Sequence, residues 1–311
     1  MDAGAAAADL LSGLSECRLC AHECGADRLS GQRGRCGAAG EMVVSSVCVH
    51  RGEEPVLTGS GGVGNVFMSG CSLSCVYCQN WQISQGCGGR VMSSSTLAEE
   101  LLRLQDLGCP TLGFVTPTHY APWIVAAVAE ASERGLERPL IYNTGSYDSL
   151  WLLRKLEGVF GIYLPDFKYW GEADSRKYSG APGYPSVARA AVKEMWRQVG
   201  KLETDASGVA VKGVLVRHLV LPNDLAGTSE IIRFLAREVS PEISVSLLSQ
   251  YNPVYRASEH PLLSRRVSAS EYARAVEVLE EEGIGSGWVQ DPERSPDSML
   301  PDFDRSDPFY G

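Results

Sequence analysis

The sequence contains no long hydrophobic run, since no window of its 311 residues approaches 18 uninterrupted apolar residues. A membrane-spanning helix is therefore not expected. Positive charge is also scarce, because 38 Asp and Glu against 28 Lys and Arg leave a net charge of −10. That balance disfavours non-specific binding of nucleic acid, which depends on Lys and Arg contacting phosphates. The first residues carry Asp2 and Asp9 where a secretory signal would be basic, so no signal peptide is expected.

Cysteine, in contrast, is plentiful. Ten cysteines are present, and most stand at Cys-x2-Cys or Cys-x3-Cys spacings. In a chain of this length such spacings indicate metal ligands in a reducing compartment rather than a set of disulfides. We therefore expect a cytoplasmic protein. Its composition, 44% hydrophobic and 21% charged, is that of an ordinary globular protein with a large core.

Three of the cysteines, Cys71, Cys75 and Cys78, follow a hydrophobic segment in the pattern C-x3-C-x2-C. A cubane iron–sulfur cluster usually takes four cysteine ligands, so three would leave one iron open to another molecule. Structural zinc sites favour sets that complete a four-coordinate tetrahedron, and this segment supplies no fourth ligand. Spaced thiols on one loop are also poor packing units for a core. The triplet therefore predicts a 4Fe-4S cluster with an open iron.

A second group of cysteines lies nearer the N-terminus and consists of Cys17, Cys20, Cys24 and Cys36. The segment that holds them is too short for a core of its own, which suggests a metal that stabilises it. Four thiolates suit structural zinc, and the spacing is equally compatible with a second four-iron cluster. His22 is an alternative ligand, and unliganded thiols are the remaining alternative. The other cysteines, Cys48, Cys87 and Cys109, follow no pattern and are expected to be free thiols.

The rest of the chain alternates between apolar runs and helical patterns. The apolar runs that read as buried parallel strands are 64–68, 111–115, 139–142, 159–164, 214–221 and 243–248. Six β/α units in sequence predict a parallel sheet with right-handed crossovers. Periodicity alone leaves open whether that sheet is a flat doubly wound one or a partial barrel.

Helices are expected between these strands, and most have recognisable ends. The first is predicted to begin with a capping box at Thr96 and Glu99 and to end at Gly108. The others are expected from Pro122 to about 135, at 147–157, 187–199 and 229–239, and from a capping box at Ser268 and Glu271 to Gly283. Two strands are expected in the N-terminal part, at 41–47 and 49–57. We predict a cysteine-rich head over 1–60, a barrel over 61–290 and an irregular tail over 291–311.

The cysteine triplet, with Tyr77 just before its last member, resembles the signature of radical S-adenosylmethionine (radical SAM) enzymes. The run from 63 to 290 is similar to proteins described as pyruvate formate-lyase activating enzymes, above all at 163–169 and 217–222. The resemblance implies a (β/α)6 partial TIM barrel with the cluster loop after the first strand. It also implies S-adenosylmethionine (SAM) as cofactor and an electron donor such as flavodoxin or ferredoxin.

The same resemblance implies a set of SAM-binding residues at the C-terminal ends of the strands, where barrels collect their reactive side chains. Thr116 and Thr118 stand where the family carries a Gly-Gly-Glu segment, whose carboxylate this chain lacks. Asn143 and Thr144 resemble an Asp-Thr-Asn-Gly segment, and Asp166 and Lys168 an Asp-x-Lys segment, which help to bind SAM and a monovalent cation. Asn143 replaces the first Asp and leaves one charge fewer for a cation. His218 stands at the place of a histidine that contacts the ribose of SAM.

Three functions remain open on these residues. The first is a glycyl-radical activase, in which SAM cleavage yields a 5′-deoxyadenosyl radical that removes hydrogen from a glycine of a partner enzyme. The second is radical modification of a small molecule, a peptide or an RNA, with the segment 250–256 shaping the substrate side. The third is a non-catalytic iron–sulfur or zinc protein that binds a partner.

Overall fold

The computed structural model describes residues 3–292, 300–305 and 307–309. Its centre is a ten-stranded sheet with the order β10-β9-β8-β6-β5-β4-β2-β1-β3, in which β7 pairs only with β8. The strands are β1 Val43–His50, β2 Val63–Met68, β3 Arg90–Val91, β4 Thr111–Val115, β5 Leu140–Thr144, β6 Ile162–Pro165, β7 Glu203–Thr204, β8 Ala210–Leu219, β9 Ser244–Leu248 and β10 Gly287–Val289.

Seven of these strands run parallel as neighbours, namely β2, β4, β5, β6, β8, β9 and β10. The first six are the predicted strands, and β10 adds a short seventh. β1 pairs antiparallel with β2 on the other side. Residues of β1 and of β10, which lie near opposite ends of the strand order, line one cavity, so the sheet curls around it. The predicted α/β fold class, a partial TIM barrel, is confirmed.

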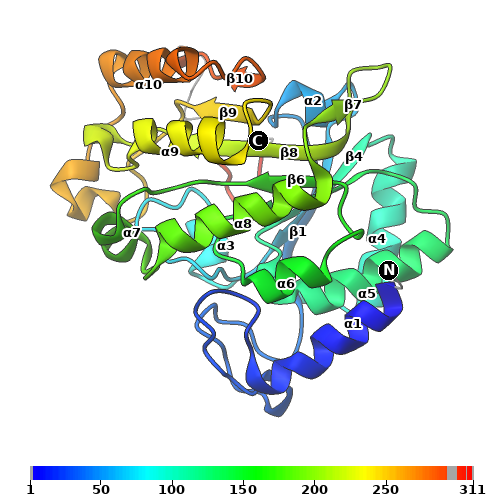
Figure 1. Ribbon diagram of the computed structural model, residues 1–311. Coiled ribbons are helices and arrows are strands. Elements are labelled where there is room, and N and C mark those ends of the chain that lie inside the picture. The colour runs from blue at the N-terminus through cyan, green and yellow to red at the C-terminus, as the bar shows by residue number, and fades with distance from the viewer. Residues whose placement is uncertain (1–2, 293–299, 306, 310–311) are drawn as a thin grey trace.

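Among the described residues, ten α-helices accompany the curled sheet, and most of them cover its outside. They are α1 Ala3–Ser12, α2 Pro55–Thr58, α3 Trp81–Ser84, α4 Ser94–Asp106, α5 Ala121–Glu133, α6 Leu150–Lys155, α7 Glu172–Ser179, α8 Tyr184–Val199, α9 Thr228–Phe234 and α10 Ala269–Glu281. In Figure 1 the helices α5, α6, α8 and α9 lie along one face of the sheet, and α1 lies alongside α5. No helix within the described ranges is long and apolar enough to span a membrane.

The alternation of each strand divides the apolar residues between two faces. Outward residues such as Phe114, Tyr142 and Val216 belong to the main core under the helices. Inward residues such as Ile141 and Leu215 pack with Val56 and Leu57 of α2 in a smaller cluster. Burying one such aliphatic side chain stabilises the fold by about 1.5–3 kcal/mol. The short helix α2 therefore forms one end of the barrel interior.

Several predicted boundaries differ from the structure. The capping box at Thr96 is wrong: Ser93 is the N-cap and its hydroxyl accepts from the Thr96 N–H, so α4 begins earlier. The capping box of Ser268 and Glu271 is confirmed. The strand expected at 49–57 is wrong, because β1 ends at His50 and Pro55 begins α2, where its missing N–H costs nothing. Helix α7 was not predicted.

The N-terminal part contributes to the same structure as the barrel. β1 extends the main sheet, and Leu10 and Leu14 belong to the main core. In the C-terminal part, Phe303 and Phe309 contact Phe67 of β2. The predicted tail also includes 293–299, which lie outside the described residues. The division of the chain at residues 60 and 290 stays a prediction.

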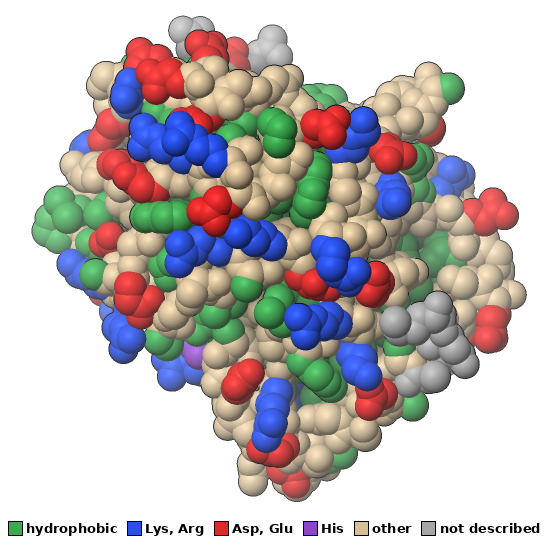
Figure 2. Space-filling view, in the orientation of Figure 1, with side chains coloured by type: hydrophobic (Ala, Val, Ile, Leu, Met, Phe, Trp, Pro, Cys, Tyr) green, Lys and Arg blue, Asp and Glu red, His purple; other side chains and the backbone are tan. Residues whose placement is uncertain are grey.

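On the face shown in Figure 2, Lys and Arg side chains alternate with Asp and Glu. Exposed ion pairs such as Lys193–Glu238 at 2.9 Å and Arg237–Glu282 at 2.7 Å join neighbouring elements of the fold. Exposed pairs of this kind stabilise a protein by no more than about 1 kcal/mol each. Charges of both signs are thus mixed over this face, and among the described residues neither sign forms a large patch on it.

Candidate functional site

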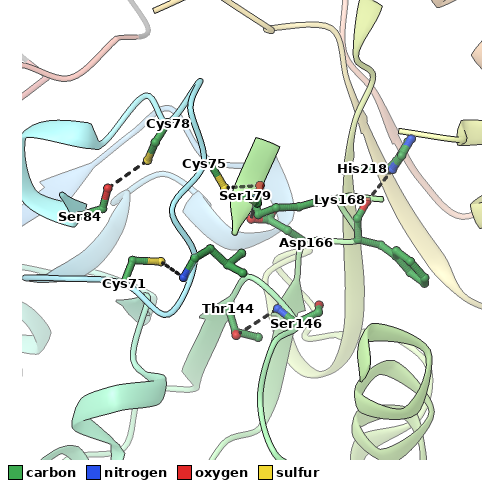
Figure 3. A network of polar contacts seen from close by, with 12 residues as sticks. Cys71, Cys75, Cys78, Ser84, Thr144, Ser146, Asp166, Lys168, Ser179 and His218 are labelled. Atoms are coloured by element: carbon green, nitrogen blue, oxygen red, sulfur yellow. Dashed lines mark hydrogen bonds and ion pairs between the residues drawn. The ribbon is translucent and has the colours of Figure 1, made fainter. Parts of the chain in front are cut away.

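Cys71, Cys75 and Cys78 lie together in the loop that follows β2 and line a cavity of about 180 Å³, called here the cysteine cavity. Six of the seven predicted SAM-binding residues line the same cavity, namely Thr116, Thr118, Asn143, Thr144, Asp166 and Lys168. They come from the ends of β4, β5 and β6. Figure 3 shows Asp166, Lys168 and Thr144 on the side of the cavity opposite the cysteine loop.

The cysteine loop is held by contacts at its start and in its middle. Gly70 adopts φ +82°, and a Cβ at this position would lie 2.5 Å from the carbonyl oxygen of Cys36, so only glycine fits. Further along, the N–H groups of Ser74 and Val76 donate to the carbonyls of Ser179 and Tyr178 at the end of α7. These contacts fix the loop before any ligand binds.

Each of the three sulfurs has a hydrogen-bond partner from the protein. The Leu73 N–H donates to Cys71 Sγ at 3.3 Å, and the Ser179 hydroxyl donates to Cys75 Sγ at 3.0 Å. Cys78 Sγ lies 3.2 Å from Ser84 Oγ. Hydrogen bonds to sulfur are one means by which proteins adjust iron–sulfur clusters.

Burial raises the pKa of all three thiols, that of Cys75 to about 11. The free thiols are therefore protonated at neutral pH, whereas metal-bound sulfur is a thiolate. Loading of the site thus releases protons. Among the described residues, no three or more His, Cys, Asp and Glu side chains are placed to hold a single metal ion.

Asp166 and Lys168 form an ion pair inside the cavity, with 2.7 Å between Oδ2 and Nζ. Burial lowers the pKa of Lys168, but the neighbouring Asp166 carboxylate and Cys75 raise it more strongly, so the pKa lies above its usual range. The ammonium therefore stays charged and lowers the pKa of Cys75. Lys168 thus supplies a positive charge that favours thiolates in this loop.

Thr118 and Thr144 are oriented by a buried carboxylate that was not predicted. Asp148 Oδ1 accepts from Thr118 Oγ1 and from the Tyr142 hydroxyl, both at 2.8 Å, and Oδ2 accepts from Thr144 Oγ1 at 2.6 Å. Asp148 is buried, and burial raises its pKa although the three hydroxyls lower it. Asp148 lies four residues beyond the end of β5, and the sequence gave no signal for it because its partners come from two different strand ends.

His218 is the one predicted SAM-binding residue that the structure does not bring to the cavity. Its Nδ1 bonds the Phe167 carbonyl at 2.7 Å and its Nε2 bonds Thr228 Oγ1 at 2.9 Å, and Figure 3 shows the ring on the far side of its strand from the cysteines. The reason is the alternation of β8, which directs the preceding Arg217 inward. Arg217 lines the cavity in its place.

Arg217 forms a buried ion-pair group with Glu53 and Glu54, also missed in the sequence. Its Nε donates to Glu54 Oε1 at 2.9 Å, and its Nη2 contacts both carboxylates. The exposed fraction of the side chain is 13% for Arg217, 12% for Glu53 and 6% for Glu54. Glu54 lies 163 residues before Arg217 in the chain. A local sequence pattern could therefore not predict that they pair.

The N-terminal cysteines are close to one another and to the cysteine loop. Cys17, Cys20 and Cys36 are buried, and the sulfurs of Cys24 and Cys36 lie 3.5 and 3.4 Å from the position of a Cβ on Gly34. Burial raises the pKa of Cys20 to about 12, and the three other thiols add to that shift. His22 Nε2 bonds the Ser72 carbonyl at 2.8 Å and so braces the loop.

The comparisons with known proteins concern relatives and folds. No family model matches the sequence. The chain is 27% identical over 274 residues to an uncharacterized protein of Methanocaldococcus jannaschii, covering 85% of this chain and 74% of that protein.

Two solved structures have a similar fold. One is a radical SAM methyltransferase from Sphaerobacter thermophilus, with a TM-score of 0.50 and 15% identity over 73% of this chain. The other is HydG, a maturase of the [FeFe]-hydrogenase, with a TM-score of 0.51 and 14% identity over 74% of this chain. This chain covers 65% and 53% of their lengths, less than two thirds of each. The protein therefore shares the fold of radical SAM enzymes.

Proposed function

We propose that the protein is a radical SAM enzyme that holds a 4Fe-4S cluster on Cys71, Cys75 and Cys78. The observation that carries the proposal is the position of these cysteines. They follow the first parallel strand of a radical SAM fold and share one cavity with polar residues from the next three strand ends. When bound, such a cluster would supply the electron that cleaves SAM into methionine and a 5′-deoxyadenosyl radical. A reducing compartment, the cytoplasm, suits that chemistry.

The residues present fit a cluster of this kind. Three sulfurs lie in one loop, each has a hydrogen-bond partner, and Lys168 offsets their negative charge. The loop is held at Gly70 and in its middle, so the sulfurs need little rearrangement. Thr116, Thr118, Asn143, Thr144 and Asp166 present hydroxyl, amide and carboxylate groups to the same space. These are suitable partners for the amine, carboxylate and ribose of SAM, and Arg217 replaces His218 as the inward residue of β8.

The experiment is SAM cleavage by the anaerobically reconstituted protein with dithionite as reductant. We expect 5′-deoxyadenosine, and we expect Cys75→Ala to abolish it together with the bound iron. Cys109→Ala is the matched control, because Cys109 is a buried free thiol that does not line the cavity. A fully loaded protein that forms no 5′-deoxyadenosine would overturn the proposal. Replacing dithionite with reduced flavodoxin or ferredoxin tests the proposed electron donor.

Glycyl-radical activation of a partner enzyme remains a second candidate, supported by the sequence resemblance to pyruvate formate-lyase activating enzymes. Its test is electron paramagnetic resonance after mixing the reduced protein, SAM and a candidate glycyl-radical enzyme. A glycyl doublet on the partner would support this function. The barrel interior described below favours a small molecule as the substrate.

We further propose that Cys17, Cys20, Cys24 and Cys36 hold a second metal site, either zinc or an iron–sulfur cluster. The support is that the four thiols lie near one another in a segment that packs against the cysteine loop. In the part of the chain that the structure describes they are not placed around a single ion, so binding would draw them together. Iron and zinc are to be quantified in a protein with Cys71, Cys75 and Cys78 all replaced by alanine. Residual iron with sulfide identifies a cluster, residual zinc identifies a zinc site, and neither metal contradicts the proposal.

A further inference from the structure

The barrel encloses a second, larger cavity of about 440 Å³ next to the cysteine cavity. Residues of β1, β2, β4, β5, β8, β9 and β10 line it, and it is called here the barrel cavity. The two cavities share Asn143, Arg217 and Gln250 among their lining residues. A volume of this size lies in the ordinary range for small-molecule sites. A molecule bound there would lie beside whatever occupies the cysteine cavity.

Charge in the barrel cavity is unbalanced. Glu53 and Glu54 carry two negative charges, and Arg217 supplies one positive charge between them. Burial raises the pKa of the Glu54 carboxyl, but Arg217 and Ser246 lower it further, so Glu54 stays ionised. Arg51 also lines the cavity, but it is exposed to solvent, which screens its charge. The buried group therefore keeps one surplus negative charge, which is costly without a partner.

Two buried polar atoms on the wall of this cavity, one of them an acceptor, have no hydrogen-bond partner. Asn65 Nδ2 donates to Glu53 Oε1 at 2.8 Å, and Arg217 is already bonded to both carboxylates. Asn80 Oδ1, on the wall shared by both cavities, is buried with no hydrogen-bond partner, as is His50 Nδ1. Buried polar atoms without a partner are rare in proteins. A ligand that donates a hydrogen bond to Asn80 Oδ1 would supply one of these missing partners.

Aromatic side chains form the rest of the wall. Phe67, Trp288 and Phe309 line the cavity together with the ring of His50. The rings of His50 and Phe309 lie 3.8 Å apart, and those of Phe67 and Phe309 lie 5.6 Å apart. Such faces bury apolar groups and attract cations. Among the described residues that line the buried part, an anion finds no free cation, since Arg217 is paired with Glu53 and Glu54.

We propose that the barrel cavity binds a small organic cation, an amine with an apolar or aromatic body, whose ammonium group pairs with Glu53. The proposal rests on the proposed function, because it names the substrate class for the radical reaction. The ammonium donates to Glu53 and to Asn80, and the body packs against Phe67, Trp288 and Phe309. The binding step itself needs neither SAM nor an electron.

The experiment is isothermal titration of the full-length, cluster-reconstituted protein with three probes that share one body. They are phenethylamine, 2-phenylethanol and 3-phenylpropanoate, which are cationic, neutral and anionic at pH 7. We expect the amine to bind at least about tenfold more tightly than the alcohol, from a charge-assisted hydrogen bond to a buried carboxylate. Equal or tighter binding of the acid, or no binding of any probe at millimolar concentration, would overturn the proposal.

Variants locate the bound amine. Glu53→Gln should weaken amine binding about tenfold or more and leave the alcohol within twofold, whereas Glu137→Gln, an exposed carboxylate far from the cavity, should change neither. Val289→Trp, on the exposed edge strand β10, should weaken amine and alcohol alike by narrowing the cavity. The Val289→Trp variant still tests the proposal if the Glu53→Gln variant does not fold. Unchanged amine binding in Val289→Trp contradicts the proposal.

This assay separates the two proposals. Absence of 5′-deoxyadenosine from a protein that binds the amine would contradict the radical SAM function alone. Formation of 5′-deoxyadenosine by a protein that ignores all three probes would contradict the substrate class alone.

Discussion

Ser179 and Cys75, separated by 104 residues, are joined by a hydrogen bond of 3.0 Å from hydroxyl to sulfur. Ser179 is the last residue of α7, and its hydroxyl also lies 2.9 Å from that of Tyr169. Both residues are buried. The structure thus aims a polar group of the barrel at one of the three sulfurs of the cysteine loop.

The first prediction is that Ser179→Ala lowers the reduction potential of the proposed cluster. A hydrogen bond to sulfur favours the reduced, more negative state. Its loss, worth about 1 kcal/mol, corresponds to a decrease of roughly 40–60 mV for one electron. A redox titration followed by electron paramagnetic resonance measures it. Ser175→Ala, in the same helix but bonded to the Glu172 carbonyl, should leave the potential unchanged, and a rise in Ser179→Ala would contradict the prediction.

The second prediction concerns the carboxylate that orients the two threonines of the cavity. Asp148→Asn leaves one oxygen to accept from three hydroxyls, so at least one buried hydroxyl loses its partner. We expect the free energy of unfolding to fall by about 1–3 kcal/mol and the KM for SAM to rise. Denaturant unfolding and SAM-cleavage kinetics measure the two effects. Tyr142→Phe removes one donor outside the cavity and should lower stability with little change in KM.

The third prediction concerns the buried ion-pair group. Glu54→Gln should lower the free energy of unfolding by about 1.5–3 kcal/mol, because it weakens the charge-assisted hydrogen bonds from Arg217 to Glu54, while Glu53 still neutralises the guanidinium. Glu277→Gln breaks a pair in which both side chains are 59% exposed and should cost less than about 1 kcal/mol. Similar losses in the two variants, measured by urea denaturation, would show that the buried group contributes no more than a surface pair.

The fourth prediction is a pH dependence caused by His218. Burial lowers its pKa from 6.5 to about 4. A depressed pKa in the folded state contributes stability above the unfolded-state pKa, and that stability is lost as pH falls from 6.5 towards 4. From pH 7 to pH 5 this loss is about 2 kcal/mol. His218→Gln should therefore lose about 2 kcal/mol less than the wild type over that interval in urea titrations, and equal losses would exclude His218 as the cause.

Much of the architecture could be predicted because its causes are local. The parallel strands are continuous apolar runs, and β4 has the predicted bounds of 111–115. The capping box at Ser268 depends on residues three apart. Local rules also explain the errors: Ser93 and Thr96 both suit an N-cap, and only packing of the following helix decides between them.

The candidate site could be predicted only where its residues follow the strand ends. Thr116, Thr118, Asn143, Thr144, Asp166 and Lys168 were found because parallel strands bring their ends to one edge of the sheet. The other site residues do not directly follow a strand end, and these are Asp148, Ser179, Glu53 and Glu54. Each acts through a partner on another element, and in the case of Ser179 that partner lies 104 residues away.

The three-cysteine loop could be recognised from the sequence, because its cysteines lie within eight consecutive residues. The order of the β/α units could be recognised as well, because hydrophobic periodicity runs along the chain. The tertiary structure alone decided which side chains face the cavities. A strand directs neighbouring residues to opposite faces, so a single step along β8 sends Arg217 inward to Glu53 and Glu54 and His218 outward to Thr228. Which of the two faces is the interior depends on how the whole sheet curls, and that is set by contacts between residues far apart in the chain.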